Sequence, residues 1–206
     1  KQKGTFSDLS FDYSIQLDNR DKAYAPTSGY ISSFSQAIPI YSDSAYIKNS
    51  YNLSVYKGFS PNYLGAFKFY SSAINGLDDK DVRVSKRVLI PSTKLRGFES
   101  GKVGPKDGRD FVGGNYAIAT NYELNLPNAL PEYTKTDVGV FLDVANVWGI
   151  DYDDSLGDSS KIRSTVGVNT SWLSPVGPMV FVFSKNVTKA ETDITETFNF
   201  RLGTTF

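Results

Sequence analysis

Residues 7–17 read Ser-Asp-Leu-Ser-Phe-Asp-Tyr-Ser-Ile-Gln-Leu, so that from Asp8 onward polar and apolar side chains alternate. Residues 197–206, Thr-Phe-Asn-Phe-Arg-Leu-Gly-Thr-Thr-Phe, repeat the alternation almost to the last residue. Successive side chains of a β-strand point to opposite faces of the sheet. Each segment is therefore predicted to be a strand with one apolar and one polar face.

Similar alternation recurs along nearly the whole chain and predicts ten strands. The predicted strands are 7–17, 28–40, 46–58, 62–74, 82–90, 113–126, 136–148, 161–173, 177–187 and 197–206. They hold more than half of the chain, far above the roughly 20–25% of residues found in strands of ordinary globular proteins. Since no segment has a helical period, the sequence predicts an all-β architecture.

The composition excludes several classes of function. The chain has 206 residues, enough for one domain or a piece of a larger one. Its 22 basic and 22 acidic residues give no net charge, which argues against a nucleic-acid partner. It has no His and no Cys, so a Ser-His-Asp triad, a Cys nucleophile, His or Cys zinc ligation and disulfides are all excluded. We therefore predict neither an enzyme nor a cofactor or metal site.

The connections indicate a membrane barrel rather than a soluble sandwich. No apolar run approaches the roughly twenty residues of a transmembrane helix, but strands that alternate can span a membrane. Two connections, 41–44 and 174–177, are short, whereas 91–112 and 149–160 are long and polar. Outer-membrane barrels keep short turns on one rim and long loops on the other. Trp148 and Trp172 end neighbouring strands, which would place one indole in each interfacial belt.

The inward positions carry two carboxylates. Apolar side chains occupy the even positions of 113–126 and 136–148, so Glu123, Phe141 and Asp143 are predicted to face the lumen. A basic side chain facing lipid would cost roughly 2–4 kcal/mol, so the placement of charged side chains toward the lumen and apolar ones toward lipid is energetically favoured. Two carboxylates could form an acid–base pair, as in glycosidases. We favour the alternative that they accept hydrogen bonds from a buried guanidinium.

The long connection 91–112 offers that guanidinium. It contains the motif Leu95, Arg96, Gly97, Phe98 and directly precedes the wall that carries the carboxylates. Folding inward would satisfy all three charges and pack Phe98 against the wall. If the connection between the two strands is symmetric, Asp143 faces Ala119 and Glu123 lies roughly 13 Å away along the strand. One arginine would then not bind both carboxylates tightly, although a stagger or bulge would close the gap. We therefore predict Asp143 as the main partner of the arginine and Glu123 as a second acceptor.

At this point the residues resemble the BamA family of the POTRA-transporter superfamily, the central subunits of the β-barrel assembly machinery. The motif Leu95–Phe98 is similar to the family's loop signature, and residues 141–148 are similar to its Phe-x-Asp-x-Gly-x-x-Trp strand, with Ala145 in place of the glycine. Further stretches similar to the family are 17–20, 25–29, 103–105, 113–115 and 172–178. The motifs keep the family's order along essentially the whole chain.

The resemblance implies an antiparallel transmembrane β-barrel of about sixteen strands. Residues 1–206 would be its C-terminal portion, with 91–112 as a long lumen-directed loop and Asp143 as the partner of Arg96. The POTRA domains and N-terminal barrel strands would be absent, and because no apolar leader follows Lys1 we expect a mature fragment of a longer protein. Whether ten strands close into a smaller barrel stays open at this point.

The resemblance also implies a function: an assembly factor of the Gram-negative outer membrane that folds and inserts barrel proteins. Its partners would be outer-membrane lipids, unfolded barrel clients and, through the POTRA domains, lipoproteins of the machinery. The alternating aromatics of the last strand resemble the signal by which barrel proteins are recognised for assembly. These residues are Phe198, Phe200, Leu202 and Phe206.

Two alternative functions are retained. One is a related transporter for autotransporter assembly or two-partner secretion, and the other is a passive outer-membrane pore or surface adhesin. Separately, one loop has clustered carboxylates, a ligand type that Ca²⁺ accepts, although we favour a solvated extracellular loop without metal. The residues of that loop are Asp151, Asp153, Asp154 and Asp158.

Overall fold

A single antiparallel sheet of nine strands dominates the computed structural model, which describes residues 5–23, 25–156, 161–175 and 177–203. In their order across the sheet, the strands are β1 (Asp8–Asp18), β2 (Ser28–Ser42), β3 (Tyr46–Ser60), β4 (Tyr63–Gly76), β7 (Tyr116–Leu126), β8 (Thr136–Trp148), β9 (Arg163–Ser174), β10 (Gly177–Thr188) and β11 (Phe198–Leu202). A separate two-residue hairpin, β5 (Lys106–Asp107) and β6 (Asp110–Phe111), lies in the connection from β4 to β7.

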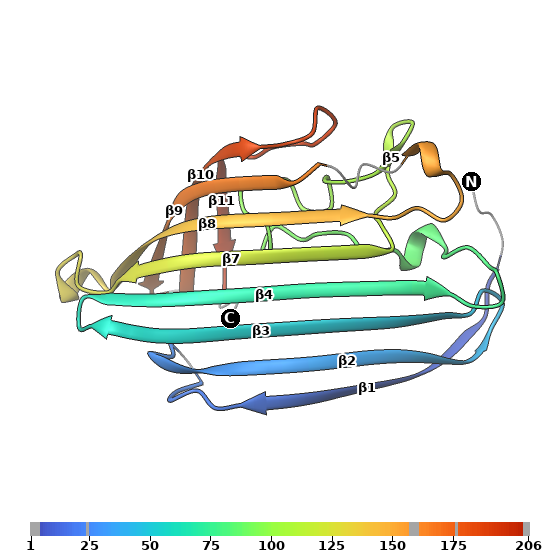
Figure 1. Ribbon diagram of the computed structural model, residues 1–206. Helices are drawn as coiled ribbons and strands as arrows, with labels where there is room; N and C mark the ends of the chain where they lie inside the picture. The colour runs from blue at the N-terminus through green and yellow to red at the C-terminus, as the bar shows by residue number, and fades with distance from the viewer. Residues whose placement is uncertain (1–4, 24, 157–160, 176, 204–206) are drawn as a thin grey trace.

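The sheet is strongly curved but remains open. In Figure 1, β1 to β8 run across the view, while β9 to β11 run steeply behind one end of them. β1 and β11 form the two edges, so within the described residues the first and last strands do not pair. The predicted all-β, antiparallel fold is therefore confirmed, and the strands do not close into a smaller barrel.

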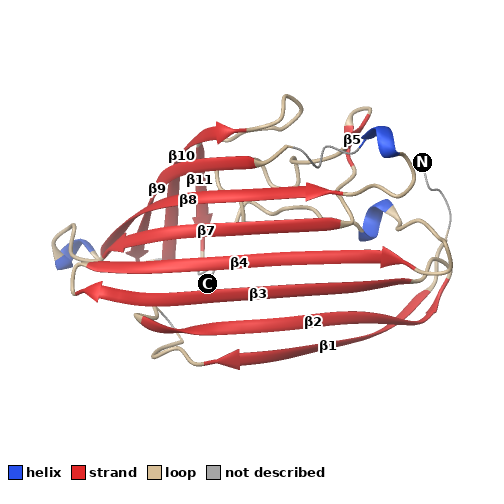
Figure 2. Cartoon of the chain, viewed as in Figure 1, coloured by secondary structure: helices blue, strands red, loops and turns tan. Residues whose placement is uncertain are grey.

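Helical structure in the described residues is limited to three short 3-10 turns (Figure 2). They are η1 (Val84–Lys86), η2 (Glu132–Thr134) and η3 (Asp154–Leu156). Among these residues no helix has the length and apolar character needed to cross a bilayer.

Nine of the ten predicted strands are present close to their expected positions, and the prediction of a strand at 82–90 is wrong. That segment contains η1 and one isolated bridge between Val88 and Gly114. Its apolar residues Val82, Val88 and Ile90 are buried because the segment packs across the sheet. Burial does not follow the alternation there, because Arg83 and Arg87 are also buried whereas Val84 is 40% exposed.

The connections separate by length less cleanly than predicted. One rim carries the long connections 77–115 and 149–162, but it also carries the short turn 43–45, which we had expected on the opposite rim. The other rim carries the two-residue connection 61–62 and the end of β11, and also the longer segments 19–27 and 127–135. Trp148 and Trp172 lie at opposite rims, as predicted.

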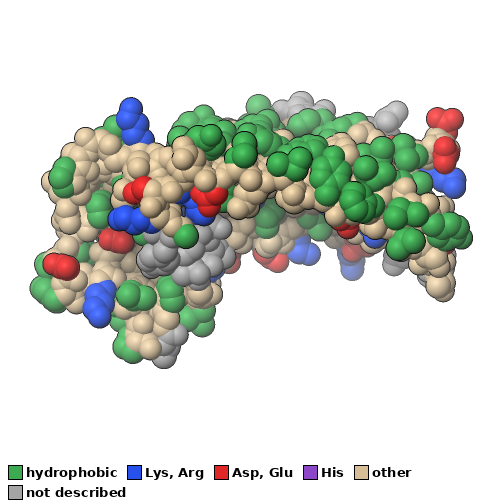
Figure 3. Space-filling model, turned by 90° about the horizontal axis from the view of Figure 1, so that it is seen from below, with side chains coloured by type: hydrophobic (Ala, Val, Ile, Leu, Met, Phe, Trp, Pro, Cys, Tyr) green, Lys and Arg blue, Asp and Glu red, His purple; other side chains and the backbone are tan. Residues whose placement is uncertain are grey.

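The two faces of the sheet differ in chemistry as the alternation predicts. In β8, Val140 and Leu142 are exposed, whereas Phe141 and Asp143 are buried. Apolar side chains continue across the outer face, and a broad hydrophobic band is visible along the long side of the molecule in Figure 3. Exposed apolar residues on this face include Phe11, Ile15, Val55, Tyr122, Val166, Val168, Phe183 and Phe198. A lipid-facing surface requires such a band.

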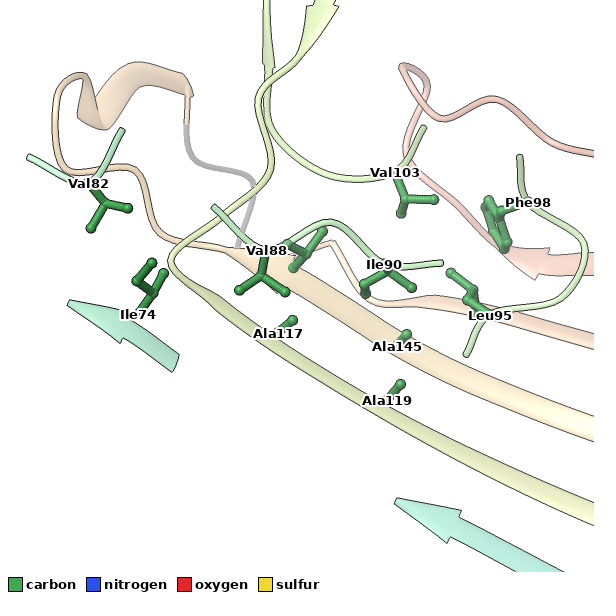
Figure 4. Close-up of a cluster of buried hydrophobic side chains, with 11 residues drawn as sticks. Ile74, Val82, Val88, Ile90, Leu95, Phe98, Val103, Ala117, Ala119 and Ala145 are labelled. Carbon is green, nitrogen blue, oxygen red and sulfur yellow. The ribbon is translucent and has the colours of Figure 1, made fainter. Parts of the chain in front are cut away.

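The core lies between the inner face of the sheet and the connection 77–115. The wall contributes Ala117, Ala119 and Ala145, whose small side chains leave room for the loop to approach. Loop residues Val82, Val88, Ile90, Leu95, Phe98 and Val103 pack over them (Figure 4). This burial fixes the loop against the sheet, because removing apolar surface from water is favourable by about 25 cal/mol per Å².

Candidate functional site

Arg96 makes a forked contact with Asp143 on the inner face of β8. Its Nε donates to Oδ2 at 2.8 Å, its Nη2 donates to Oδ1 at 2.8 Å, and its own backbone N–H donates to Oδ2 at 3.0 Å. Two parallel bonds between a guanidinium and a carboxylate combine charge with fixed geometry. The expected pairing of Arg96 with Asp143 is thus present in the structure.

The same guanidinium also reaches Glu123 on β7. Arg96 Nη1 donates to Glu123 Oε2 at 3.1 Å, and Asn169 Nδ2 donates to the other carboxylate oxygen at 3.2 Å. Glu123 is thus the second acceptor that we expected, and the separation of about 13 Å that a symmetric connection would give does not occur. Both inward carboxylates are engaged by one cation, which leaves neither of them available as a free acid–base group.

The strand register explains why Asp143 and Glu123 lie closer together than the roughly 13 Å expected from the sequence. Asp143 pairs with Asn121 and not with Ala119, so Glu123 is its diagonal neighbour, and such neighbours lie about 7–8 Å apart. The connection between β7 and β8 is asymmetric, because Thr136 and Asp137 extend beyond β7 and pair only with β9. The symmetric turn assumed from the sequence therefore placed Asp143 two residues away from its true partner.

Burial makes this contact energetically important. The side chain of Asp143 has no exposed surface, that of Arg96 is 8% exposed and that of Glu123 is 13% exposed. The inward-facing Phe141 lies beneath the cation, with the guanidinium carbon 3.6 Å from the ring centroid. A desolvated guanidinium gains about 2 kcal/mol or more from an aromatic face. The carboxylates of Asp143 and Glu123 and the ring of Phe141 together offset the cost of removing the Arg96 guanidinium from water.

Glycine and asparagine allow the loop to lie so close to the wall. Gly97 has a φ of +85°, and a Cβ there would lie 2.7 Å from Thr165 Oγ1 and 2.9 Å from Ser184 Oγ. Asn121 donates to the carbonyl of Lys94 at 2.9 Å, and Asn186 donates to the carbonyl of Gly97 at 2.9 Å. The wall therefore satisfies loop backbone groups on both sides of Arg96, which the sequence did not reveal.

Among the described residues, three further arginine–carboxylate pairs join segments that are distant in sequence, and the sequence analysis identified none of them. Arg83 pairs with Asp8 at the start of β1, and Arg87 pairs with Asp151. Arg163 on β9 pairs with Asp193 in the connection before β11, and neither side chain has exposed surface. Their partners are distant in sequence, so no local motif marks them.

The role of Asp151 bears on the proposed calcium loop. Burial favours a higher pKa for Asp151, but hydrogen bonds from Val82 N–H and Asn115, together with the charge of Arg87, outweigh it and lower the pKa. This carboxylate thus serves a protein-internal contact. The side chain of Asp154 and the whole of Asp158 fall outside the described residues, and the described part of the chain contains no cluster of three potential metal ligands.

The terminal strand presents its aromatic residues on the outer face. Phe198 and Phe200 lie against Phe183 and Phe181 of β10, with ring centroids 5.0 and 5.2 Å apart. Leu202 pairs with Met179 and is exposed, whereas Phe206 falls outside the described residues.

Comparison with known proteins places this geometry in a family. Residues 1–206 match the Omp85 superfamily domain. The chain belongs to the Omp85 superfamily. It is similar to the outer membrane protein assembly factor BamA of Neorickettsia risticii, with 25% identity over 94% of the chain and 27% of that protein. It is also similar to the BamA of Neisseria meningitidis, with 30% identity over 54% of the chain and 17% of that protein.

The chain is also similar to one further protein in sequence and to one crystal structure. A SAM50-like protein of Schizosaccharomyces pombe is 24% identical over 90% of the chain and 42% of its own length. The crystal structure of BamA from Haemophilus ducreyi lacking POTRA domains 1–3 superposes with a TM-score of 0.86 and 26% identity, covering 93% of this chain and 41% of that one. The chain thus spans less than half of each Omp85 relative named here, and its fold is that of part of a BamA barrel.

Proposed function

We propose that the full protein containing this chain folds β-barrel proteins and inserts them into the Gram-negative outer membrane. The main support is the structural similarity to BamA, which covers 93% of the chain. In this proposal, residues 1–206 form the C-terminal portion of the barrel and 91–112 lie in its lumen. POTRA domains and N-terminal barrel strands belong to the remainder of the protein, where the POTRA domains bind lipoproteins of the machinery.

The proposed activity uses strand pairing and not covalent chemistry, cofactors or metals. The outer edges of β1 and β11 carry N–H and C=O groups that pair with no other described strand. In lipid such groups need a partner, and the available partner is another strand. The N-terminal part of the barrel would cover β1, while β11 would face either the first barrel strand or an incoming client strand.

The activity can be tested with the full-length protein in vesicles. We expect an unfolded outer-membrane barrel protein to fold several-fold faster in vesicles that contain the full-length protein than in empty vesicles of the same lipids. Protease protection and heat-modifiable migration measure the folded fraction. Ion conductance without faster client folding would support a passive pore instead. Export of a passenger protein without faster client folding would support the related secretion transporters.

The terminal strand is proposed to act as a recognition element for the chain's own assembly. Deleting Phe206 should slow assembly in cells several-fold but lower the stability of folded protein by less than the roughly 1.5–3 kcal/mol of a fully buried aromatic. Pulse-chase of folded and unfolded forms measures the first quantity, and urea unfolding measures the second. Phe59→Ala is the control, because Phe59 is an exposed aromatic near the rim at which β11 ends but outside the terminal strand. If the deletion and the control slow assembly equally, Phe206 serves only as an interfacial anchor.

A further inference from the structure

Residues 194–196, just before β11, pair through their backbone with the long loop and not with β10. The Glu99 N–H donates to the Ile194 carbonyl at 3.0 Å, and the Ile194 N–H donates to the Lys102 carbonyl at 3.1 Å. The Glu196 N–H donates to the Gly97 carbonyl at 3.0 Å. A bridge between Phe98 and Thr195 completes a short antiparallel contact. Residues 194–196 therefore lie directly on the loop segment that follows Arg96.

Asp193 fixes this contact at its start. Its carboxylate accepts two bonds from Arg163, Nε at 2.9 Å and Nη2 at 3.1 Å. It also accepts the Gly104 N–H of the loop at 3.3 Å and the Ala190 N–H of its own connection at 2.7 Å. One buried carboxylate thus joins β9, the long loop and the connection 189–197.

This arrangement determines where the terminal strand begins. β10 extends to Thr188, but its pairing with β11 stops at Phe183 and Phe198. Beyond that point Ser184 binds the segment before β11, donating its N–H to the Thr197 carbonyl at 2.9 Å and its hydroxyl to the Glu196 carbonyl at 3.1 Å. The segment turns inward here, so that β11 begins only at Phe198 and has five residues in the described part of the chain.

We propose that Asp193 is a positioning residue that couples the Arg96 loop to the terminal edge strand. By holding 190–197 on the loop, it sets the start of β11 and hence the length of the edge that meets another strand. Arg96 contacts the sheet at one end of the loop segment 96–104, and Asp193 binds Gly104 at its other end. The consequence for client folding rests on the proposed function, whereas the coupling itself does not.

The test is hydrogen exchange of the full-length protein in detergent or nanodiscs, comparing Asp193→Asn with Asp151→Asn. Both variants remove the charged partner of a buried arginine, and both carboxylates accept a backbone N–H of the connection 77–115, Gly104 for Asp193 and Val82 for Asp151. The hydrogen bonds of Asp151 are to Val82, Arg87 and Asn115 and not to 190–197. We expect Asp193→Asn to speed exchange in both 96–104 and 190–197 by about tenfold or more, since the buried Arg163 then loses the opposing charge of this carboxylate. Asp151→Asn should leave exchange in 190–197 unchanged.

Either of two results would overturn the coupling: faster exchange confined to one of the two segments in Asp193→Asn, or equal loosening of 190–197 in Asp151→Asn. If Asp193→Asn does not fold, exchange is measured in Arg163→Lys instead. Lysine keeps the positive charge but cannot donate the two parallel hydrogen bonds that Arg163 makes to the Asp193 carboxylate. Client folding should fall several-fold more in Asp193→Asn than in Asp151→Asn. Equal rates would overturn the positioning role, whereas no client folding by the unsubstituted protein would count against the proposed function alone.

Discussion

Replacing Arg96 with alanine is expected to lower the free energy of unfolding of the full-length protein by about 3–5 kcal/mol, the cost of leaving a buried carboxylate unpaired. Asp143→Ala should have a similar effect, because it strands the guanidinium with Glu123 alone. Each variant should also impair barrel assembly in cells. The double variant should be little worse than either single one, since the second substitution removes the charge that the first left unpaired. Urea unfolding and the amount of heat-modifiable protein in the membrane are the measurements.

The control for this comparison of single and double variants is Lys94→Ala, two residues before Arg96 in the same loop. Lys94 donates one hydrogen bond to Asn52 at 3.0 Å, and its ammonium lies 5.0 Å from the Tyr70 ring centroid. Losing this charged hydrogen bond should cost about 1.5–3 kcal/mol, less than the expected loss in Arg96→Ala. Fully additive losses for Arg96→Ala and Asp143→Ala would contradict direct coupling, because additivity is the behaviour of independent sites.

The sequence was most informative where one residue pattern reports one physical constraint. In β8, apolar even positions and inward Asp143 follow from a strand with lipid on one side and protein on the other. The same logic failed at 82–90, where burial does not follow the alternation: Arg83 and Arg87 are buried and Val84 is 40% exposed. A pattern of alternating residue types therefore does not distinguish a strand from a loop that packs on a sheet.

Other features depend on contacts that no local pattern records. The register of β7 and β8 was set by an asymmetric connection, which placed Glu123 beside the partner of Arg96. The pair Arg163 and Asp193 joins residues far apart in sequence and lies near no motif. The Arg96 loop could be predicted because its residues resemble a family motif, whereas the ion pairs that hold the rest of the loop emerge only from the fold.

Gly97→Ala is expected to destabilise the loop through two independent effects. At a φ of +85°, any residue with a Cβ is strained, at roughly 1–2 kcal/mol for left-handed backbone. The new methyl would also lie 2.7 Å from Thr165 Oγ1 and 2.9 Å from Ser184 Oγ, and such overpacking costs about 1–3 kcal/mol. The free energy of unfolding should therefore fall by about 2–5 kcal/mol, the sum of these two ranges. Assembly should be impaired because the backbone that carries Arg96 is forced off the wall.

Gly108→Ala separates the two effects, because Gly108 has a φ of +59° but nothing within 4 Å of its added Cβ. It should show only the backbone strain, about 1–2 kcal/mol, and near-normal assembly. Equal losses in the two variants would mean that contact with β9 and β10 contributes nothing at Gly97. Because that contact seats the loop carbonyl that binds Asn186 and Glu196, the larger loss at Gly97 should appear together with faster exchange in 190–197. A stable Gly97→Ala protein with slow exchange there would contradict the close packing of the motif on the wall.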